Sequence, residues 1–320
     1  MNTTYQIMHG DKVIASIDTR GHCRIYAPVF MPYGLVLDDS AADLDSLVAR
    51  LALSYRCVSL TDIFWIKSAE EDISFSAVNL FENHLENAFV DVSLRGRQMT
   101  VTNRCLERDL STNGLFPKAW LRTDHGFLLL KDGGRASVEN ELLASKICQC
   151  FQCSQVVYEE KVYDGEKVSA SSLMTSLEHS IVSREAYEIY AANHDQNALE
   201  DVLQLDAYSF YMMNILDYLT GNTDRHWGNW GFLVDNRTNR PISLHPLMDF
   251  NQTFQAYDRL EGANCQTVFP LRATQQEAAV TAVSQIGLNQ LREVDEAWFC
   301  GDRKKSEMFF HRLDTLKKKL

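Results

Sequence analysis

Residues 221–229, GNTDRHWGN, are a polar stretch between two apolar ones. The preceding residues, which run to Tyr218, have the apolar spacing of a helix, and Gly221 stands where a glycine commonly ends one. The residues that follow, from Trp230, have the pattern of a strand. A polar loop between two buried elements is a common place for a functional site, so this stretch constrains the fold that surrounds it.

The segment after this loop predicts a β-hairpin. Residues 230–234 (WGFLV) and 241–245 (PISLH) flank the turn-rich sequence DNRTNR. In a hairpin the start of the first strand and the end of the second lie at the same edge. We therefore expect Asp224 and Asn229, which precede the first strand, to lie close to Asp249, which follows the second.

Two acids and an amide at one edge suit Mg²⁺, which prefers oxygen ligands and completes its shell with phosphates and water. Asp224 and Asn229 are spaced as D-x-x-x-x-N, the arrangement of a protein kinase catalytic loop, and Asp249 takes the place of a second metal-binding acid. Asp and Asn also cap ordinary turns, so the interpretation depends on a second half of a nucleotide site elsewhere in the chain.

The sequence NGLFPKAWLRTDHGFLLLK supplies a candidate for that second half. It predicts a turn containing Gly114, a strand over residues 118–122, and a second strand that ends at Lys131. Hairpin geometry brings the turn and the lysine to one edge. Backbone N–H groups and one ammonium can then approach a polyphosphate together.

The residues after Lys131 predict a helix, SVENELLASKIC, with Ser137 as its N-cap. A lysine that ends a strand and pairs with an acid on the next helix is the arrangement that positions a kinase lysine. We expect Glu141 to be the partner, with Glu139 as the alternative.

Element types change along the chain. The first half is rich in short strand-like runs joined by Gly and Asp turns, which predicts one curled sheet with a few helices; the second half is mostly helical around the hairpin. We predict an α+β, bilobal fold from this pattern, and the kinase-type loop and lysine described above favour a protein-kinase-like one. Residues 1–172 form a strand-rich N-lobe with the phosphate loop and ATP lysine, and residues 173–320 a helical C-lobe with the catalytic loop.

Composition restricts the partners and the compartment. The 320 residues carry a net charge of -12, and the densest basic run is the terminal LKKKL, so direct binding to nucleic acid is not expected. No apolar run approaches membrane-spanning length and the N-terminus does not resemble a signal peptide, which favours a cytoplasmic protein. Of the 8 cysteines, only those at residues 148, 150 and 153 lie close together, and a zinc site would need a second pair with comparable spacing. We therefore predict that the cysteines are reduced thiols.

The most specific stretches together resemble a known family. The sequence GNTDRHWGNWGFLV, followed by LHPLMDFNQTF and preceded by NGLFPK and LLLK with ENELLAS, resembles the HipA-like serine/threonine kinases of bacteria over roughly residues 105–255. The fold of that family is bilobal and related to eukaryotic protein kinases and phosphatidylinositol kinases.

The resemblance implies a role for each matched residue. Asp224 is implied as the catalytic acid, and Asn229 and Asp249 as ligands of Mg²⁺. Lys131 is implied to contact the phosphates of ATP, and Gly114 with its neighbours to form the phosphate loop.

Five further residues have weaker assignments. Lys118 is a second candidate for contact with the nucleotide. His226 and Arg225 are implied to hold the catalytic loop structurally. Some relatives carry an autophosphorylated serine at the phosphate loop, for which Ser111 or Thr112 is the candidate here.

The predicted function is an ATP- and Mg²⁺-dependent kinase that phosphorylates a Ser/Thr hydroxyl of a protein substrate, with an antitoxin-like regulator as a further partner that the family suggests. A small-molecule or lipid kinase would use the same residues. A metallophosphoesterase could use Asp224, His226, His245 and Asp249 around a metal but would have no need of Lys131. A nucleotide-binding regulator without turnover is the non-enzymatic alternative.

Overall fold

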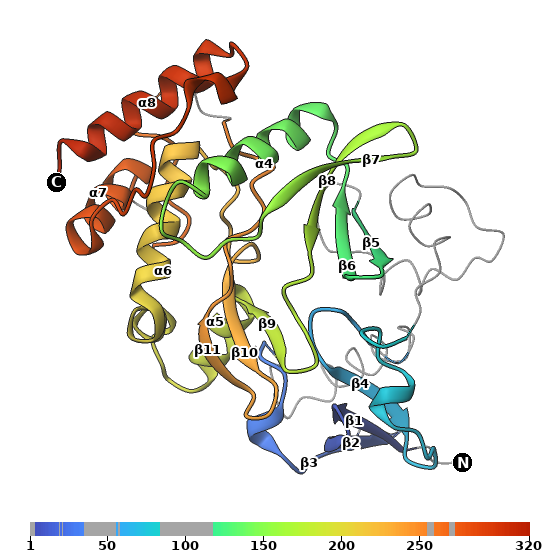
Figure 1. Ribbon diagram of the computed structural model, residues 1–320. Coiled ribbons are helices and arrows are strands. Elements are labelled where there is room, and N and C mark those ends of the chain that lie inside the picture. The colour runs from blue at the N-terminus through green and yellow to red at the C-terminus, as the bar shows by residue number, and fades with distance from the viewer. Residues whose placement is uncertain are drawn as a thin grey trace.

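The computed structural model describes residues 4–18, 20, 22–34, 56, 58–83, 118–254, 259–268 and 273–320 (Figure 1). The strands of this part of the chain are β1 (Thr4–His9), β2 (Lys12–Asp18), β3 (Cys23–Ile25), β4 (Phe64–Ser68), β5 (Lys118–Thr123), β6 (Gly126–Lys131), β7 (Tyr158–Tyr163), β8 (Glu166–Ser172), β9 (His179–Ser183), β10 (Gly231–Asp235) and β11 (Arg240–Leu244). The helices are α4 (Arg135–Cys148), α5 (Arg184–Asn193), α6 (Ala198–Thr220), α7 (Gln275–Ile286) and α8 (Arg303–Lys317), with 3₁₀ turns η1 (Pro28–Phe30), η2 (Phe75–Ala77) and η3 (Glu296–Phe299).

Where the structure describes the strand-rich first half, its strands form two sheets. The first sheet has the antiparallel order β3-β2-β1-β4, and the second has the order β5-β6-β8-β7. The single curled sheet expected from the sequence is therefore wrong. Short strands with local turns predict hairpins well, but they carry no information on which hairpins share a sheet.

The second sheet presents the predicted hairpins. β5 and β6 pair in register, so that Lys118 faces Lys131 across the strands. β7 and β8 are joined by Asp164 and Gly165, both with positive φ, as a two-residue Asp-Gly turn requires. Helix α4 packs against β7 and β8. Its N-cap is Gly134, which makes no side-chain cap bond, so the prediction that Ser137 caps this helix is wrong.

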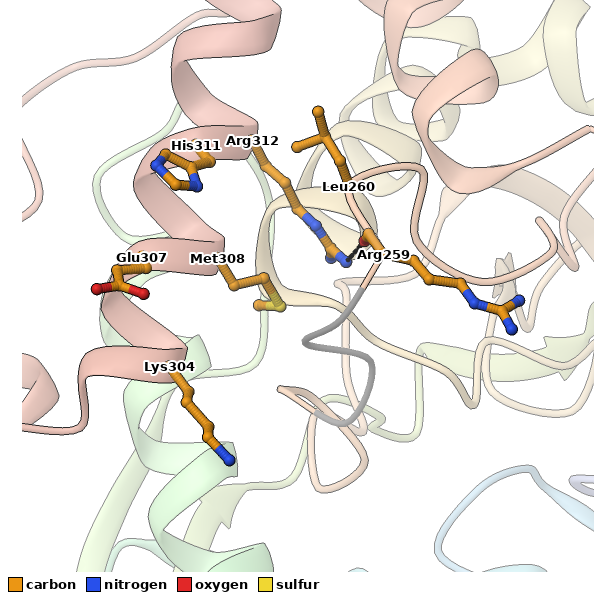
Figure 2. A pocket seen from close by; sticks show the side chains of 7 residues that line it. All are labelled: Arg259, Leu260, Lys304, Glu307, Met308, His311 and Arg312. Atoms are coloured by element: carbon orange, nitrogen blue, oxygen red, sulfur yellow. Dashed lines mark hydrogen bonds between the residues drawn. The ribbon is translucent and has the colours of Figure 1, made fainter.

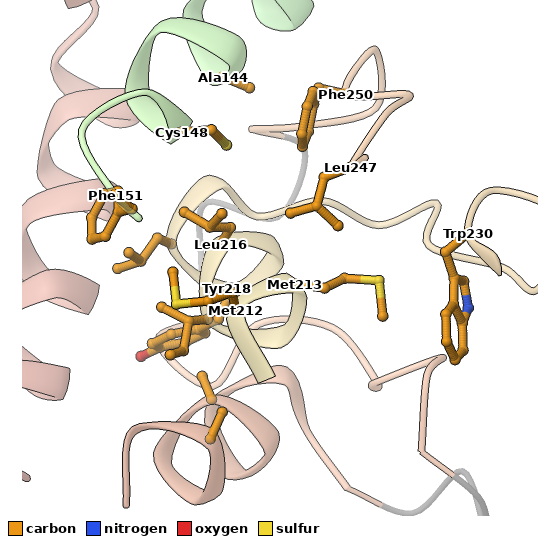
Figure 3. Packing of buried hydrophobic residues seen from close by; sticks show 14 of the residues in the cluster. Ala144, Cys148, Phe151, Met212, Met213, Leu216, Tyr218, Trp230, Leu247 and Phe250 are labelled. Atoms are coloured by element: carbon orange, nitrogen blue, oxygen red, sulfur yellow. The ribbon is translucent and has the colours of Figure 1, made fainter. Parts of the chain in front are cut away.

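Helix α6 is the centre of the mostly helical second half. Its last turns are buried on every side, and α5, α7, α8 and β11 contact it. Figure 3 shows Met212, Met213 and Leu216 of α6 packed among residues of α4 and of the segment that follows β11. The helix ends at Thr220, and Gly221 adopts the left-handed conformation that its sequence position predicted.

The first half of α6 departs from an ideal helix. Asp206 has φ -155° and ψ 63°, and its carboxylate accepts hydrogen bonds from the backbone N–H groups of Ser209 and Leu244. Leu205, which directly precedes this kink, is exposed although the segment around it has the apolar spacing of a helix.

The chain segment after β3, residues 26–34, connects the first sheet to the second half of the molecule through hydrogen bonds. The amide nitrogen of Asn239, in the turn between β10 and β11, donates to the carbonyl oxygens of Val29 and Met31. In return, the hydroxyl of Tyr33 donates to the carbonyl oxygen of Asn239, and its ring stacks on Tyr187. Figure 1 shows this segment alongside the β10–β11 hairpin.

In the described part of the chain, no helix is long and apolar enough to cross a membrane. The six cysteines described there are free thiols, and Cys148 and Cys150 are buried.

Candidate functional site

The structure gathers three polar side chains around the ammonium of Lys131. This lysine ends β6, is buried, and lies 2.7 Å from the carboxylate of Glu141, 3.2 Å from that of Asp249 and 3.2 Å from the hydroxyl of Tyr158. Burial alone would lower the pKa of Lys131, but the carboxylates of Glu141 and Asp249 outweigh it and hold that pKa well above its ordinary value. The side chain is therefore a fixed cation.

Glu141, and not Glu139, is the acid on helix α4 that pairs with Lys131. Glu141 is 1% exposed, and its second carboxylate oxygen accepts a hydrogen bond from the hydroxyl of Ser169 on β8. Glu139 faces outward and bonds Arg135, one helical turn earlier. The two glutamates are two positions apart, with only Asn140 between them, so they lie on different sides of the helix.

Lys118 adds a second cation to the cluster. It pairs with Lys131 across β5 and β6, so the two side chains share one face of the sheet. Its ammonium lies 3.8 Å from a carboxylate oxygen of Asp249. Burial lowers the pKa of Lys118, and Asp249 opposes that shift. Asp249 thus holds two lysines together that would otherwise repel each other.

Asp249 has an unusual backbone. Its φ is 60°, in the left-handed region that asparagine and aspartate tolerate better than most residues. The residue after it, Phe250, is fully buried and packs edge-on against Tyr158. The hydroxyl of Tyr158 accepts a hydrogen bond from the backbone N–H of Asp249 at 3.2 Å. Sequence reasoning did not identify Tyr158, because nothing local distinguishes this tyrosine from others in a strand.

The loop at residues 221–229 brings Asp224 and Asn229 together. The amide nitrogen of Asn229 lies 2.8 Å from the carbonyl oxygen of Asp224 and 3.5 Å from its carboxylate. His226 Nδ1 accepts a hydrogen bond from the N–H of Gly228, and Nε2 lies 3.9 Å from the Asp224 carboxylate. The imidazole side chain is more than half exposed, so its contribution to the loop is modest.

Arg225 fixes the loop more firmly than His226 does. Its guanidinium makes two hydrogen bonds to the carboxylate of Asp217, at 2.9 and 3.0 Å, from inside the protein. It also donates to the carbonyl oxygens of Asn229 and Met248. The buried side chain of Arg225 therefore connects helix α6, the loop at residues 221–229 and the segment that contains Asp249.

Asp217 is a second residue that sequence reasoning missed. An acid four residues before Gly221, in the mostly apolar last turns of the helix, was a usable signal, because a buried carboxylate needs a partner.

The two acids of the site are shifted in opposite directions. Burial raises the pKa of Asp224, and the nearby charge of Asp249 adds to this effect. Burial acts in the same sense on Asp249, but Lys131 and Lys118 overcome it and lower the pKa of that carboxyl. Asp224 is thus the better proton acceptor of the two, and Asp249 the more permanent anion.

The donor set fits a magnesium ion bound together with a nucleotide. Asn229 uses its amide nitrogen within the loop, which leaves its oxygen as a ligand, and Asp249 offers a carboxylate. Among the described residues, no group of three or more His, Cys, Asp and Glu side chains could hold a metal. Mg²⁺ suits this arrangement because it takes one or two protein oxygens and completes its shell with phosphate and water.

The surroundings of His245 do not favour the metallophosphoesterase alternative. His245 is buried, burial lowers its pKa to about 4, and its Nδ1 lies 2.8 Å from the carbonyl oxygen of Pro246. It is therefore a neutral histidine that is engaged with the backbone.

Three residues singled out in the sequence, Gly114, Ser111 and Thr112, lie outside the described residues. Their assignments to a phosphate loop and to autophosphorylation stay predictions.

A cavity of about 520 Å³ lies elsewhere, between helix α8 and residues 259–260 (Figure 2). It shares no lining residue with the cluster around Lys131. Figure 2 shows Glu307 and His311 pointing away from Arg259, so the charged ends do not converge on a common point. The Lys131 cluster, where charged side chains from several elements do meet, is therefore the candidate functional site.

Comparison with known proteins gives structural likeness only. The sequence matches no protein-family model and no curated protein. Among solved structures, the HipA chain of the Shewanella oneidensis MR-1 toxin–antitoxin complex of HipA, HipB and operator DNA is similar over 98% of this chain and 97% of its own, with 12% identity and a TM-score of 0.52. The Helicobacter pylori proinflammatory kinase CtkA is similar over 65% of this chain and 90% of its own, with 16% identity and a TM-score of 0.47. The chain therefore has the α+β, kinase-like fold of HipA.

Proposed function

We propose that this protein is a kinase that transfers the γ-phosphate of ATP, with Mg²⁺, to a serine or threonine hydroxyl of a protein. The observation that carries the proposal is the cluster in which Lys131 contacts both Glu141 and Asp249 next to the loop of Asp224 and Asn229. A lysine–glutamate pair, a metal-binding aspartate and a D-x-x-x-x-N loop are the parts that phosphoryl transfer requires, and HipA shares the fold.

Each side chain has a defined task in this reaction. Asp224 accepts a hydrogen bond from the acceptor hydroxyl and orients it, and its raised pKa makes it the better proton acceptor. Lys131 is held as a cation where the nucleotide phosphates would lie, and Lys118 beside it adds a second positive charge. Asn229 and Asp249 are the residues that would hold Mg²⁺, which supplies further neutralisation of phosphate charge when bound.

The partner assignments follow from the same likeness. The HipA neighbour belongs to a complex with HipB and operator DNA. We extend only the protein part to this chain, as an antitoxin-like regulator, because a net charge of -12 disfavours direct contact with a phosphate backbone.

The test is phosphate transfer from γ-labelled ATP to the protein itself and to Ser/Thr peptide pools, followed by intact-mass spectrometry. We expect a gain of one phosphate in an acceptor with the wild type. Asp224→Ala should reduce transfer by about 10²- to 10⁴-fold and leave binding of ATP nearly unchanged, because Asp224 orients the acceptor and not the nucleotide. Peptide mapping decides whether Ser111 or Thr112 is modified.

Asp314→Ala is the matched control, since Asp314 forms only an exposed ion pair with Lys318 on α8 and should leave transfer unchanged. A gain of an AMP unit would keep the fold and overturn the reaction. Binding of ATP without transfer to any acceptor would favour a nucleotide-binding regulator, and full activity of Asp224→Ala would remove Asp224 from the mechanism.

A further inference from the structure

The hydroxyl of Tyr158 lies between the two charged halves of the site. Its oxygen is 3.2 Å from the ammonium of Lys131 and 3.2 Å from the backbone nitrogen of Asp249. Both of these groups can only donate hydrogen bonds, so the tyrosine oxygen accepts from both at once. One uncharged atom therefore links the lysine on the second sheet to the aspartate that follows β11.

Tyr158 is held in this place by contacts on either side. Its own backbone N–H donates to the hydroxyl of Ser145 on α4, the helix that carries Glu141. Just before it, the N–H of Val156 donates to the carbonyl oxygen of Leu247, and the N–H of Leu247 donates to that of Ser154. The segments that carry Tyr158 and Asp249 thus run side by side, joined by backbone hydrogen bonds.

The packing of the ring leaves it little freedom. Tyr158 is 6% exposed, and its ring meets Phe250 edge-on with centroids 6.3 Å apart and planes at 83°. Because Phe250 is fully buried beside Asp249, the ring and the hydroxyl of one tyrosine contact two successive residues of the sequence DFN.

Asp249 depends on this contact more than a residue in regular structure would. At φ 60° it lies outside any helix or strand ladder, and it is 9% exposed, so its backbone N–H needs a specific acceptor. The tyrosine hydroxyl is that acceptor. Without it, the N–H would be left unpaired and the left-handed conformation would lose a hydrogen bond that favours it.

We propose that Tyr158 is a positioning residue that sets the place of the Asp249 carboxylate and thereby the affinity of the site for its divalent cation. The proposal rests on the proposed function for the identity of the ligand. The hydroxyl has two hydrogen-bond partners: Asp249, which would bind the metal, and Lys131, which would stay paired with Glu141 if the hydroxyl were removed. We therefore expect the hydroxyl to act on metal binding and not on binding of the nucleotide or the acceptor.

The test is Tyr158→Phe, which removes one oxygen atom and keeps the ring. Binding of Mn²⁺ is measured by electron paramagnetic resonance of the free ion, in the presence of a saturating non-hydrolysable ATP analogue. We expect the dissociation constant for Mn²⁺ to rise about tenfold, as loss of one buried hydrogen bond implies. The affinity for the analogue without metal should change by less than about twofold. In turnover, the Mg²⁺ concentration for half-maximal rate should rise, with kcat at saturating Mg²⁺ retained.

Tyr187→Phe is the matched control. Tyr187 is also buried, and its hydroxyl donates to Asp201 at 3.1 Å, on α5 and α6 away from the cluster. This variant should bind Mn²⁺ as the wild type does.

Wild-type affinity for Mn²⁺ in Tyr158→Phe, an equal loss in both variants, or no Mn²⁺ binding by the wild type would each overturn the positioning role. The metal measurement needs no turnover. An absence of phosphate transfer with a Tyr158-dependent Mn²⁺ site would therefore refute the kinase and keep the positioning role.

Discussion

At the scale of single residues, the site shows how different surroundings give two aspartate carboxylates different properties. Asp224 lies in a partly buried loop where the side chain of His226 is 3.9 Å away, whereas Asp249 lies against the two lysines Lys131 and Lys118. Their pKa values move apart for that reason. A pair of acids whose pKa values are separated in this way is typical of sites that assign one acid to proton transfer and another to charge.

This separation predicts the pH dependence of transfer. Asp224 works as a carboxylate, so activity should fall as the pH drops through its pKa, and burial places that pKa above the ordinary aspartate value of about 4. Asp249, whose pKa is lowered, stays charged over the same range and should not limit the rate. A profile of log kcat/KM against pH, with circular dichroism at each pH to confirm folding, checks this. An acid limb at or below about 4 would contradict the role of Asp224.

Much of the residue-level prediction from the sequence rested on spacing along the chain. The hairpin predicted that Asp224 and Asn229 lie near Asp249, because it returns the chain to the same edge, and the pattern of a strand-ending lysine before a helix predicted the pairing of Lys131 with Glu141. Tyr158 and Asp217 could not be found in this way. Their partners lie on other elements, and only the packed structure shows which elements meet.

At the scale of elements, strand β10 depends on a residue without a side chain. Gly231 begins β10 and pairs with Ser183 of β9, and a Cβ atom there would lie 2.1 Å from the carbonyl oxygen of Val182. Backbone cannot move aside as a flexible side chain can. Strand β10, which follows the loop at residues 221–229, can therefore pair this closely with β9 because residue 231 has no Cβ atom.

Gly231→Ala should lower the free energy of unfolding by about 1–3 kcal/mol, because overpacking forces β9 and β10 apart. Urea unfolding of the variant and the wild type measures the difference. Gly228→Ala is the comparison, since its Cβ atom would meet only the imidazole of His226 at 2.9 Å, and that half-exposed side chain can rotate away. Equal losses in the two variants would show that loop strain, and not the β9–β10 contact, determines the effect.

The elements also show where a periodic pattern stops being sufficient. The apolar spacing of α6 predicted a helix that ends before Gly221, which the structure confirms. The same spacing does not reveal that Leu205 is exposed, next to Asp206, which leaves the helical conformation and bonds the backbone of β11. A side chain that caps a distant strand leaves no trace in the local pattern.

At the scale of the whole molecule, the residues of the candidate site come from both halves of the chain. Lys131, Glu141 and Tyr158 belong to the second sheet and α4, and Asp224 and Asp249 flank the β10–β11 hairpin. A ligand that contacts both sets would join the halves and raise the stability of the molecule. The lobe boundary predicted at residue 172, where β8 ends, stays a prediction.

A non-hydrolysable ATP analogue at about 100 times its dissociation constant should stabilise the protein by about 2.7 kcal/mol. Added Mg²⁺ should raise the melting temperature further, because the ion tightens binding of the analogue. In Asp249→Ala the increment due to Mg²⁺ should disappear, whereas the analogue alone should still stabilise the protein. Differential scanning fluorimetry measures both effects, and an unchanged Mg²⁺ increment in the variant would remove Asp249 from the metal site.

The turn between β10 and β11 has a consequence for how the sequence can vary. Surface turns between strands are usually where inserted residues are tolerated best. Here Asn236 and Asn239 are buried, Asn236 bonds Ser180 and the carbonyl oxygen of Leu177, and Asn239 bonds the segment after β3. An insertion at this turn would disturb the hydrogen bonds that Asn239 makes to the segment after β3. We therefore expect the turn at one end of this hairpin to tolerate changes of length poorly, although it lies at the far end from the candidate loop at residues 221–229.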